Sequence, residues 1–306
     1  MLKLRSLLLF VIIFTSTVAS ANSPNIMVSI KPFYNICARV MQSVGSPNLL
    51  LKNNASPHDY QLRPSEAKFI DSSDLIIWGG PDLESYLQKP INSLANRDLN
   101  LATIPGLTLL PLRTSSDWHS HDHEHGHHHA HAVHDSHFWL DPQNAIIIAT
   151  AIAQRLGEID PTHAKIYADN ATAFAKEINQ KIKVWQQKLN PYQDKPYIAL
   201  HDAYQYFNKY FELDGAGSIT LNPEVPPSTK RIKQIQSILV SKGVTCIFSE
   251  PQFNYKIIDM LIAGTNVHKG ELDPLGQDKD AGPNGYIILI DNLVQSFVQC
   301  NAQKNG

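Results

Sequence analysis

Residues 160–191 read DPTHAKIYADNATAFAKEINQKIKVWQQKLNP, and this stretch sets the architecture of the chain. Its apolar residues recur every three or four positions, which is the period of one face of an α-helix. They are Tyr167, Ala171, Phe174, Ile178, Ile182, Trp185 and Leu189. Asp160 and Pro161 are typical of the first positions of a helix, and Pro191 ends the pattern. About 29 residues at 1.5 Å each would form a rod of roughly 43 Å, long enough to span two domains.

Short buried strands alternate with helices on both sides of this long helix. Before it, we expect strands at 26–30, 49–51, 75–78 and 107–112; after it, we expect strands at 197–200, 217–221, 244–249 and 266–272. Such alternation predicts an α/β fold, in which helices cover both faces of a parallel sheet. The sequence therefore predicts two similar α/β lobes, residues 22–159 and 191–306, joined by one rigid helix at 160–190.

The first 21 residues have the pattern of a secretory signal peptide. Lys3 and Arg5 precede an apolar run at 7–14, and small residues follow up to Ala21. The run is too short for a comfortable membrane span, and Ala19-Ser20-Ala21 fits a cleavage site. We therefore expect residues 1–21 to direct export and to be removed after Ala21.

The composition is that of an ordinary globular protein. The 306 residues are 43% apolar and 18% charged, with a formal net charge of −2. The sequence has no basic patch, which argues against nucleic acid as a partner.

Three cysteines, at 37, 246 and 300, allow at most one intramolecular disulfide, with three possible choices. Export makes such a bond possible. Cys246 and Cys300 are the favoured pair, because both lie in the C-terminal half, one in a strand and one at the end of a helix. Cys37 follows the apolar pattern of the first helix and is expected to pack as a small buried side chain.

Residues 119–134 read HSHDHEHGHHHAHAVH and hold nine of the fourteen histidines. These are His119, His121, His123, His125, His127, His128, His129, His131 and His134. Imidazole is the commonest metal ligand in proteins and suits zinc, copper and nickel. A segment with so little apolar area cannot pack a core, so we expect a mobile loop over 115–136. An expression tag or inert polar filler is the alternative, but a tag would normally lie at a terminus.

Three of the other five histidines share a setting. His58 follows a strand, His201 lies at the carboxyl end of a strand, and His137 comes just before a helix that Asp141 and Pro142 begin. In open parallel sheets, ligands bind beyond the carboxyl ends of the strands. We therefore expect these three side chains to converge in a cleft between the lobes. The two remaining histidines, His163 and His268, lack this setting.

Several motifs resemble those of the periplasmic zinc-binding proteins of ABC transporters, the ZnuA-type proteins. The resemblance covers nearly all of the chain after residue 21. It is carried by PHDYQLRPS at 57–65, WGGPDLESYL at 78–87, HFWLDP at 137–142, HDAYQYF at 201–207, NPE at 222–224, FSEPQF at 248–253 and LDPLG at 272–276. A His-rich segment just before the second ligand motif is also typical of zinc-binding members.

This resemblance implies one Zn²⁺ between the lobes, with His58, His137 and His201 as its ligands. Manganese-binding relatives place a carboxylate at the third position, so His201 favours zinc. The fourth ligand is open between Asp273, water and a histidine of the tract, because Pro57 stands where some zinc-binding relatives have Glu. The resemblance also supports a disulfide between Cys246 and Cys300.

Partners beyond the ligands should orient the imidazole rings. Glu250, at the end of a strand, is a candidate, with an ordinary loop carboxylate as the alternative. Asp202 is a second candidate, although it could instead cap the helix that follows it.

The function that the resemblance implies is capture of Zn²⁺ in the periplasm, by a monomer, and delivery to an inner-membrane ABC permease. In this role the protein is not an enzyme, and the histidine tract is an accessory. A periplasmic zinc buffer or adhesin-like protein is the first alternative. A zinc hydrolase is the second, because three histidines and an open position also describe catalytic zinc.

Overall fold

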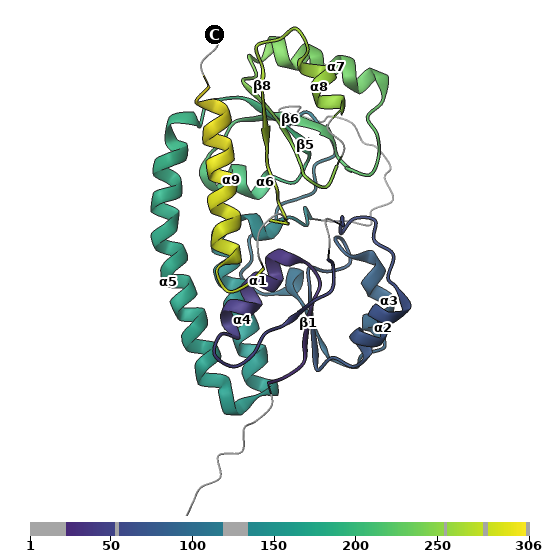
Figure 1. Cartoon of the computed structure of the whole chain (residues 1–306), viewed down its shortest axis with the longest axis vertical. Helices are drawn as coiled ribbons and strands as arrows, with labels where there is room; N and C mark the ends of the chain where they lie inside the picture. Colours follow the sequence, from purple (N-terminus) through teal and green to yellow (C-terminus); the bar gives the residue numbers. More distant parts are fainter. Residues whose placement is uncertain (1–22, 53–54, 119–133, 254–255, 278–280, 304–306) are drawn as a thin grey trace, which may run out of the picture.

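The computed structural model describes residues 23–52, 55–118, 134–253, 256–277 and 281–303. The proposed signal segment at 1–21 lies outside these residues. The described chain forms two α/β lobes, one above the other, with long helices running beside both (Figure 1). The predicted fold class, two lobes with parallel sheets joined by a long helix, is confirmed.

The two sheets have the same topology. The N-terminal sheet has the order β2-β1-β3-β4 and the C-terminal sheet the order β6-β5-β7-β8, and all the paired strands are parallel. The first sheet consists of β1 (Ile26–Val28), β2 (Asn48–Leu49), β3 (Leu75–Trp78) and β4 (Asp98–Asn100). The second consists of β5 (Tyr197–His201), β6 (Gly215–Thr220), β7 (Cys246–Ser249) and β8 (His268–Glu271). In both sheets the inner strands are fully buried, as expected for sheets covered on both faces.

The helices connect the strands and cover the sheets. In the N-terminal half they are α1 (Lys31–Val40), α2 (Pro64–Asp71), α3 (Gln88–Asn92) and α4 (Pro142–Ile159). The C-terminal lobe has α6 (Gln205–Phe211), α7 (Thr229–Ser241) and α8 (Lys256–Ile262), and α9 (Gly285–Asn301) ends the chain. None of the helices in the described ranges is long and apolar enough to cross a membrane.

The long helix α5 (Ala164–Leu189) has 26 residues, which corresponds to about 39 Å. The seven apolar residues that predicted it are the seven that it buries. Its start differs from the prediction, because Pro161–His163 forms a 3-10 turn. Asp160 does not cap the helix; its carboxylate accepts hydrogen bonds from the Tyr167 hydroxyl and His163 Nδ1, each at 2.7 Å.

Helix α9 is a second element that contacts both lobes, which the sequence did not predict; it runs along the C-terminal lobe and begins next to α1 of the N-terminal lobe (Figure 1). At its start, Arg39 of α1 donates to Asn284 Oδ1 at 3.1 Å. At its end, Cys300 forms the predicted disulfide with Cys246 of β7, with 6.1 Å between the Cα atoms. In between, Asp291 accepts hydrogen bonds from Lys181 and Trp185 of α5. The lobes are therefore tied together by two packed helices.

The strand expected at 107–112 is wrong. Pro111 lies within it, and two of its amides bond to side chains: Thr108 N–H to Asn144 Oδ1 and Leu110 N–H to the Tyr206 hydroxyl, both at 2.9 Å. The sheet is instead completed by β4, a short edge strand whose polar sequence, DLN, gives little strand signal. Trp78 Nε1 donates to Asp98 Oδ2 at 3.0 Å and ties this edge strand to β3.

Glu84 is a fully buried carboxyl group just beyond the end of β3. Its Oε2 accepts the Gly79 N–H at 2.7 Å. Burial raises the pKa of Glu84 to about 7, although hydrogen bonds, including those from the Gly79 and Gly80 amides, oppose the shift. The folded protein therefore binds this proton more tightly than the unfolded chain does.

Glu84→Gln should stabilise the protein at alkaline pH. The stability that the protonated carboxyl provides is fully present below about pH 4.5 and is lost as pH rises through about 7. An amide does not ionise, so we expect the free energy of unfolding of the variant at pH 8 to exceed that of wild type by roughly 2 kcal/mol. The gain should shrink steadily towards pH 4.5. Urea denaturation at several pH values measures it, with the exposed Glu224→Gln as control; a pH-independent difference would contradict the assignment.

Candidate metal centre

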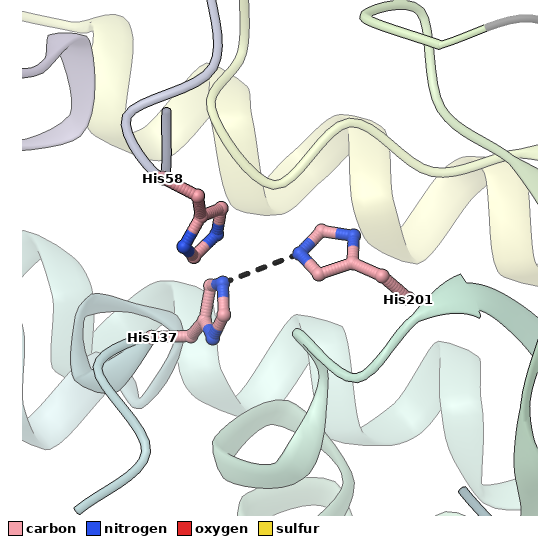
Figure 2. A group of neighbouring side chains, drawn as sticks. All are labelled: His58, His137 and His201. Atoms are coloured by element: carbon pink, nitrogen blue, oxygen red, sulfur yellow. Dashed lines mark hydrogen bonds between the residues drawn. The ribbon is translucent and has the colours of Figure 1, made fainter. Parts of the chain in front are cut away.

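Three histidines from separate segments meet between the lobes. His58 lies on the loop between β2 and α2, and His137 immediately precedes the 3-10 turn Phe138–Leu140 that leads into α4. His201 is the last residue of β5. One nitrogen from each ring lies within 4.8 Å of the other two, and Figure 2 shows the three rings turned towards a common point. Of the His, Cys, Asp and Glu residues in the described ranges, these three form the group suited to a metal ion.

The spacing of the nitrogens fits zinc. His137 Nε2 and His201 Nε2 lie 3.3 Å apart (Figure 2). Two ligands of a tetrahedral zinc ion, each about 2.05 Å from the metal, are separated by about 3.3 Å. The ring centroids are 5.3 Å apart for His58 and His137, 5.6 Å for His58 and His201, and 5.2 Å for His137 and His201. The three rings can therefore bind one ion without large rearrangement.

The walls of the site are largely apolar. The lining includes Pro57, Trp139, Phe253, Pro274 and Leu275. His137 and His201 are buried, at 6% and 3% exposure, whereas His58 is half-buried. Because apolar walls exclude water, the nitrogens are poorly solvated in the absence of a ligand, which favours binding of a cation by neutral imidazoles.

Buried carboxylates orient two of the three rings. His137 Nδ1 pairs with Asp135 Oδ1 at 2.7 Å, and His201 Nδ1 pairs with Glu250 Oε1 at 2.7 Å. A carboxylate that accepts the Nδ1 proton leaves the Nε2 lone pair free for a metal and raises the basicity of the ring. The two Nε2 atoms that face each other across 3.3 Å are thus the ones made available.

Asp135 is a functional residue that the sequence reasoning missed. Besides the ring, its Oδ1 accepts the His137 backbone N–H at 2.9 Å, and its carbonyl oxygen accepts the Tyr206 hydroxyl at 2.7 Å. Asp135 falls within the segment predicted as a mobile loop, 115–136, yet it is only 2% exposed. An acidic residue two positions before a candidate ligand was the available signal, hidden by the dense tract beside it.

The Asp202 carboxylate does not cap α6, and its hydrogen-bond partner is Arg113 instead of a histidine ring. Its carboxylate pairs with Arg113 at 2.6 Å, and the Arg113 guanidinium lies 4.6 Å from the ring centre of Trp118. Burial raises the pKa of Asp202, and Arg113 opposes this shift. The charge of Asp202 contributes to the raised pKa of His201, and its ion pair with Arg113 holds the segment that precedes the histidine tract.

Asp273 also lies outside the group of three histidines. Its carboxylate accepts hydrogen bonds from Gln252 Nε2 at 2.8 Å, Leu275 N at 3.0 Å and Gln277 N at 2.6 Å. In this arrangement, the residue orders the turn that follows β8.

The histidine tract is described only at its ends. Its histidines from 119 to 131 lie outside the described residues, whereas His134 forms an isolated bridge with Pro111. At the other end, the Ser116 carbonyl accepts the Ser218 N–H at 2.9 Å, and Trp118 packs against Tyr197. The ends of the segment predicted as a loop at 115–136 are thus held in place, because they carry residues that pack on the C-terminal lobe.

The two histidines set aside by the sequence reasoning lie away from the site. His163 pairs with Asp160 at the start of α5, and His268 is part of β8.

The surroundings of His58 and His201 shift the pKa values of the two rings in opposite directions. Burial lowers the pKa of His58 well below its ordinary value, and the neighbouring rings of His137 and His201 add to this effect. Burial also acts to lower the pKa of His201, but the Glu250 carboxylate, together with Asp202 and Asp135, raises it above 6.5. In the metal-free protein, His58 is therefore neutral at physiological pH, and His201 retains its proton to higher pH than His58 does.

Metal binding should weaken as pH falls through the pKa of His201, because the proton competes with the metal for the ring. In Glu250→Gln, the carboxylate that raises this pKa is gone, so the decline should move to lower pH. At pH 8, the variant should bind zinc about tenfold more weakly, since its ring is less basic and less firmly oriented. Competition titrations against a chelator between pH 5.5 and 8 measure both effects.

The matched control is Glu158→Gln, at the far end of α4 from His137. It should reproduce the wild-type profile. If Glu250→Gln kept the wild-type midpoint, its role at His201 would be excluded.

The chain matches one protein family over residues 26–300, described as Zinc-uptake complex component A periplasmic (ZnuA). The high-affinity zinc uptake system protein ZnuA of Brucella abortus is 41% identical over 303 residues, covering 90% of this chain and 91% of that protein.

Two solved structures show the same fold. A crystal structure of ZnuA aligns with a TM-score of 0.77 and 24% identity, over 91% of this chain and 99% of that one. A laminin-binding adhesin from Streptococcus agalactiae gives a TM-score of 0.76 and 24% identity, over 90% and 99%. At this level of identity, the two structures establish the fold and leave the ligand to be argued from the site.

Proposed function

Because the chain belongs to the family of periplasmic zinc-uptake components, ZnuA, we propose that it captures Zn²⁺ outside the inner membrane and delivers it to an ABC permease. Its relatives are named as parts of high-affinity zinc uptake systems, and the sequence begins with an export signal pattern. The observation that carries the proposal is the convergence of three imidazole nitrogens within 4.8 Å of one another, two of them 3.3 Å apart as in a tetrahedral zinc site. The protein works as a monomer in this proposal.

We propose that His58, His137 and His201 are the zinc ligands, with Asp135 and Glu250 orienting two of them. Three nitrogen donors suit zinc, whereas a carboxylate in the set would suit manganese. Water is the best-supported fourth ligand, because the Asp273 carboxylate already accepts three hydrogen bonds outside the group. A bound water also offers the permease a position at which a competing ligand can enter.

Release is proposed to depend on loop movement more than on closure of the lobes. Helix α5 runs along both lobes, α9 reaches from the C-terminal lobe to α1, and the two helices bond to each other through Asp291. Packed helices of this kind resist hinge bending, so small shifts near the site become the available motion. Of the three ligands, His58 lies on a loop, whereas His201 belongs to a central strand.

The histidine tract is proposed to be an accessory that binds further ions weakly. The test is to replace its histidines between 119 and 131 by Ser, leaving Trp118, His134 and Asp135 intact. One tightly bound zinc ion should remain, and only the weaker additional ions should be lost. Loss of the tight ion would support the first alternative, a zinc buffer or adhesin-like protein whose main binding element is the tract.

The second alternative, a zinc hydrolase, needs a general base beside the metal. Glu250 would be the candidate, but its Oε1 already pairs with His201 Nδ1, so it serves to orient the ring. We expect the zinc-loaded protein to hydrolyse an activated ester no faster than the metal-free protein. Zinc-dependent turnover that disappears in His201→Ala would favour the hydrolase.

A further inference from the structure

His58 differs from the other two histidines in what holds its ring. The Nδ1 atoms of His137 and His201 each meet a buried carboxylate at 2.7 Å. Within the part of the chain that the structure describes, the His58 ring has no such carboxylate, and its backbone N–H bonds to Ser56 Oγ at 3.3 Å. The position of this ring therefore depends on the position of its loop.

The turn that follows β8 is a rigid support close to that loop. The Asp273 carboxylate accepts the amides of Leu275 and Gln277, and Gly276, at φ +64°, allows the chain to turn sharply between them. The turn is also fixed from outside, because Trp139 Nε1 donates to the Pro274 carbonyl at 2.8 Å. The backbone of Gln277, from which its side chain starts, is thereby held in place.

Gln277 joins this turn to the His58 loop across the two lobes. Its side-chain Nε2 donates to the Ala55 carbonyl at 3.0 Å, three residues before His58. Its own carbonyl accepts Lys31 Nζ from the start of α1 at 2.9 Å. Ala55 and Lys31 belong to the N-terminal lobe, whereas Gln277 follows the last strand of the C-terminal sheet.

We propose that Gln277 is the positioning residue for His58. It fixes the loop through the Ala55 carbonyl and so does for His58 what Asp135 and Glu250 do for the other two rings. When this hydrogen bond breaks, the loop at 55–58 can move away from the C-terminal lobe, and zinc loses His58 before His137 or His201. The inference rests on the proposed function, because it assigns the step that opens the zinc site. It also gives Asp273 a role in ordering the turn instead of binding the metal.

The test begins with Gln277→Leu, which keeps a side chain of similar size and removes the donor. Zinc should dissociate about fivefold faster from this variant, measured by stopped-flow mixing of the zinc-loaded protein with excess chelator. Gln193→Leu is the matched control, because Gln193 Nε2 also donates to a backbone carbonyl, that of Phe211, at 3.0 Å within the C-terminal lobe. The control should release zinc at the wild-type rate.

A double-mutant cycle separates positioning of His58 from a general structural effect. In a His58→Ala background, Gln277→Leu should leave the zinc dissociation rate unchanged, because the ring through which it acts is absent. The visible spectrum of bound Co²⁺ should change with Gln277→Leu in the presence of His58 and not in its absence. A fivefold effect that persists in His58→Ala would overturn the inference.

The outcomes also separate this inference from the proposed function. If the wild-type protein holds one zinc ion tightly and Gln277→Leu releases it at the wild-type rate, the inference alone fails. If the wild-type protein holds no zinc at the three histidines, the proposed function fails as well.

Discussion

His201→Ala is expected to lower zinc affinity at least 100-fold. Structural zinc sites with four ligands bind with apparent free energies of about 10–16 kcal/mol, so one nitrogen accounts for roughly 3 kcal/mol. The change also removes the ring that pairs with the fully buried Glu250 carboxylate at 2.7 Å. Competition with a chelator of known affinity at pH 7.5 measures the loss, and His58→Ala and His137→Ala should show losses of similar size.

His163→Ala is the matched control for this series. His163 also pairs with a carboxylate, that of Asp160, at 2.7 Å, but lies at the start of α5. Its removal should leave zinc affinity unchanged. Wild-type affinity in His201→Ala would show that the tight ion is held elsewhere.

Removal of the disulfide should have the largest effect on stability. The bond between Cys246 and Cys300 closes a loop with a sequence separation of 54, which stabilises the protein by about 4 kcal/mol in the chain-entropy description. It also joins the end of α9 to β7, so its loss frees one end of a helix that contacts both lobes. A Cys246→Ala, Cys300→Ala variant should therefore unfold at much lower urea concentration than wild type.

Two comparisons make the disulfide prediction specific. A reducing agent should destabilise wild type by a similar amount and leave the double variant unchanged. Cys37→Ala is the control, because Cys37 is buried in α1 and its loss should cost only about 1 kcal/mol through reduced packing. Equal stability of the oxidised wild type and the double variant would contradict this account.

The sequence predicted the elements whose signals are local. The apolar period of α5 named all seven of its buried residues, and the four apolar residues of β3 predicted its bounds. Edge strand β4 has no such signal, because it is short and polar. The stretch at 107–112 is apolar like a strand but does not join the sheet. Its amides bond instead to Asn144 and Tyr206, which are distant in the sequence and so give no local signal.

At the site, too, residues with a local sequence signal were predicted and residues that act through distant contacts were not. His58, His137 and His201 could be found because each follows a strand or precedes a helix and belongs to a recognisable motif. Their convergence depends on how two lobes meet, which no local pattern encodes. Asp135 and Gln277 were missed because their roles lie in contacts, one with a neighbouring ring and one across the lobes. Their residue types alone carry no sign of either contact.

The most direct test of the central claim is anomalous X-ray diffraction at the zinc edge from crystals grown with one equivalent of Zn²⁺. We expect one strong peak between the lobes, with nitrogens of His58, His137 and His201 each about 2.0–2.1 Å away. A main peak within residues 119–134, or one that lacks any of these three nitrogens, would contradict the claim.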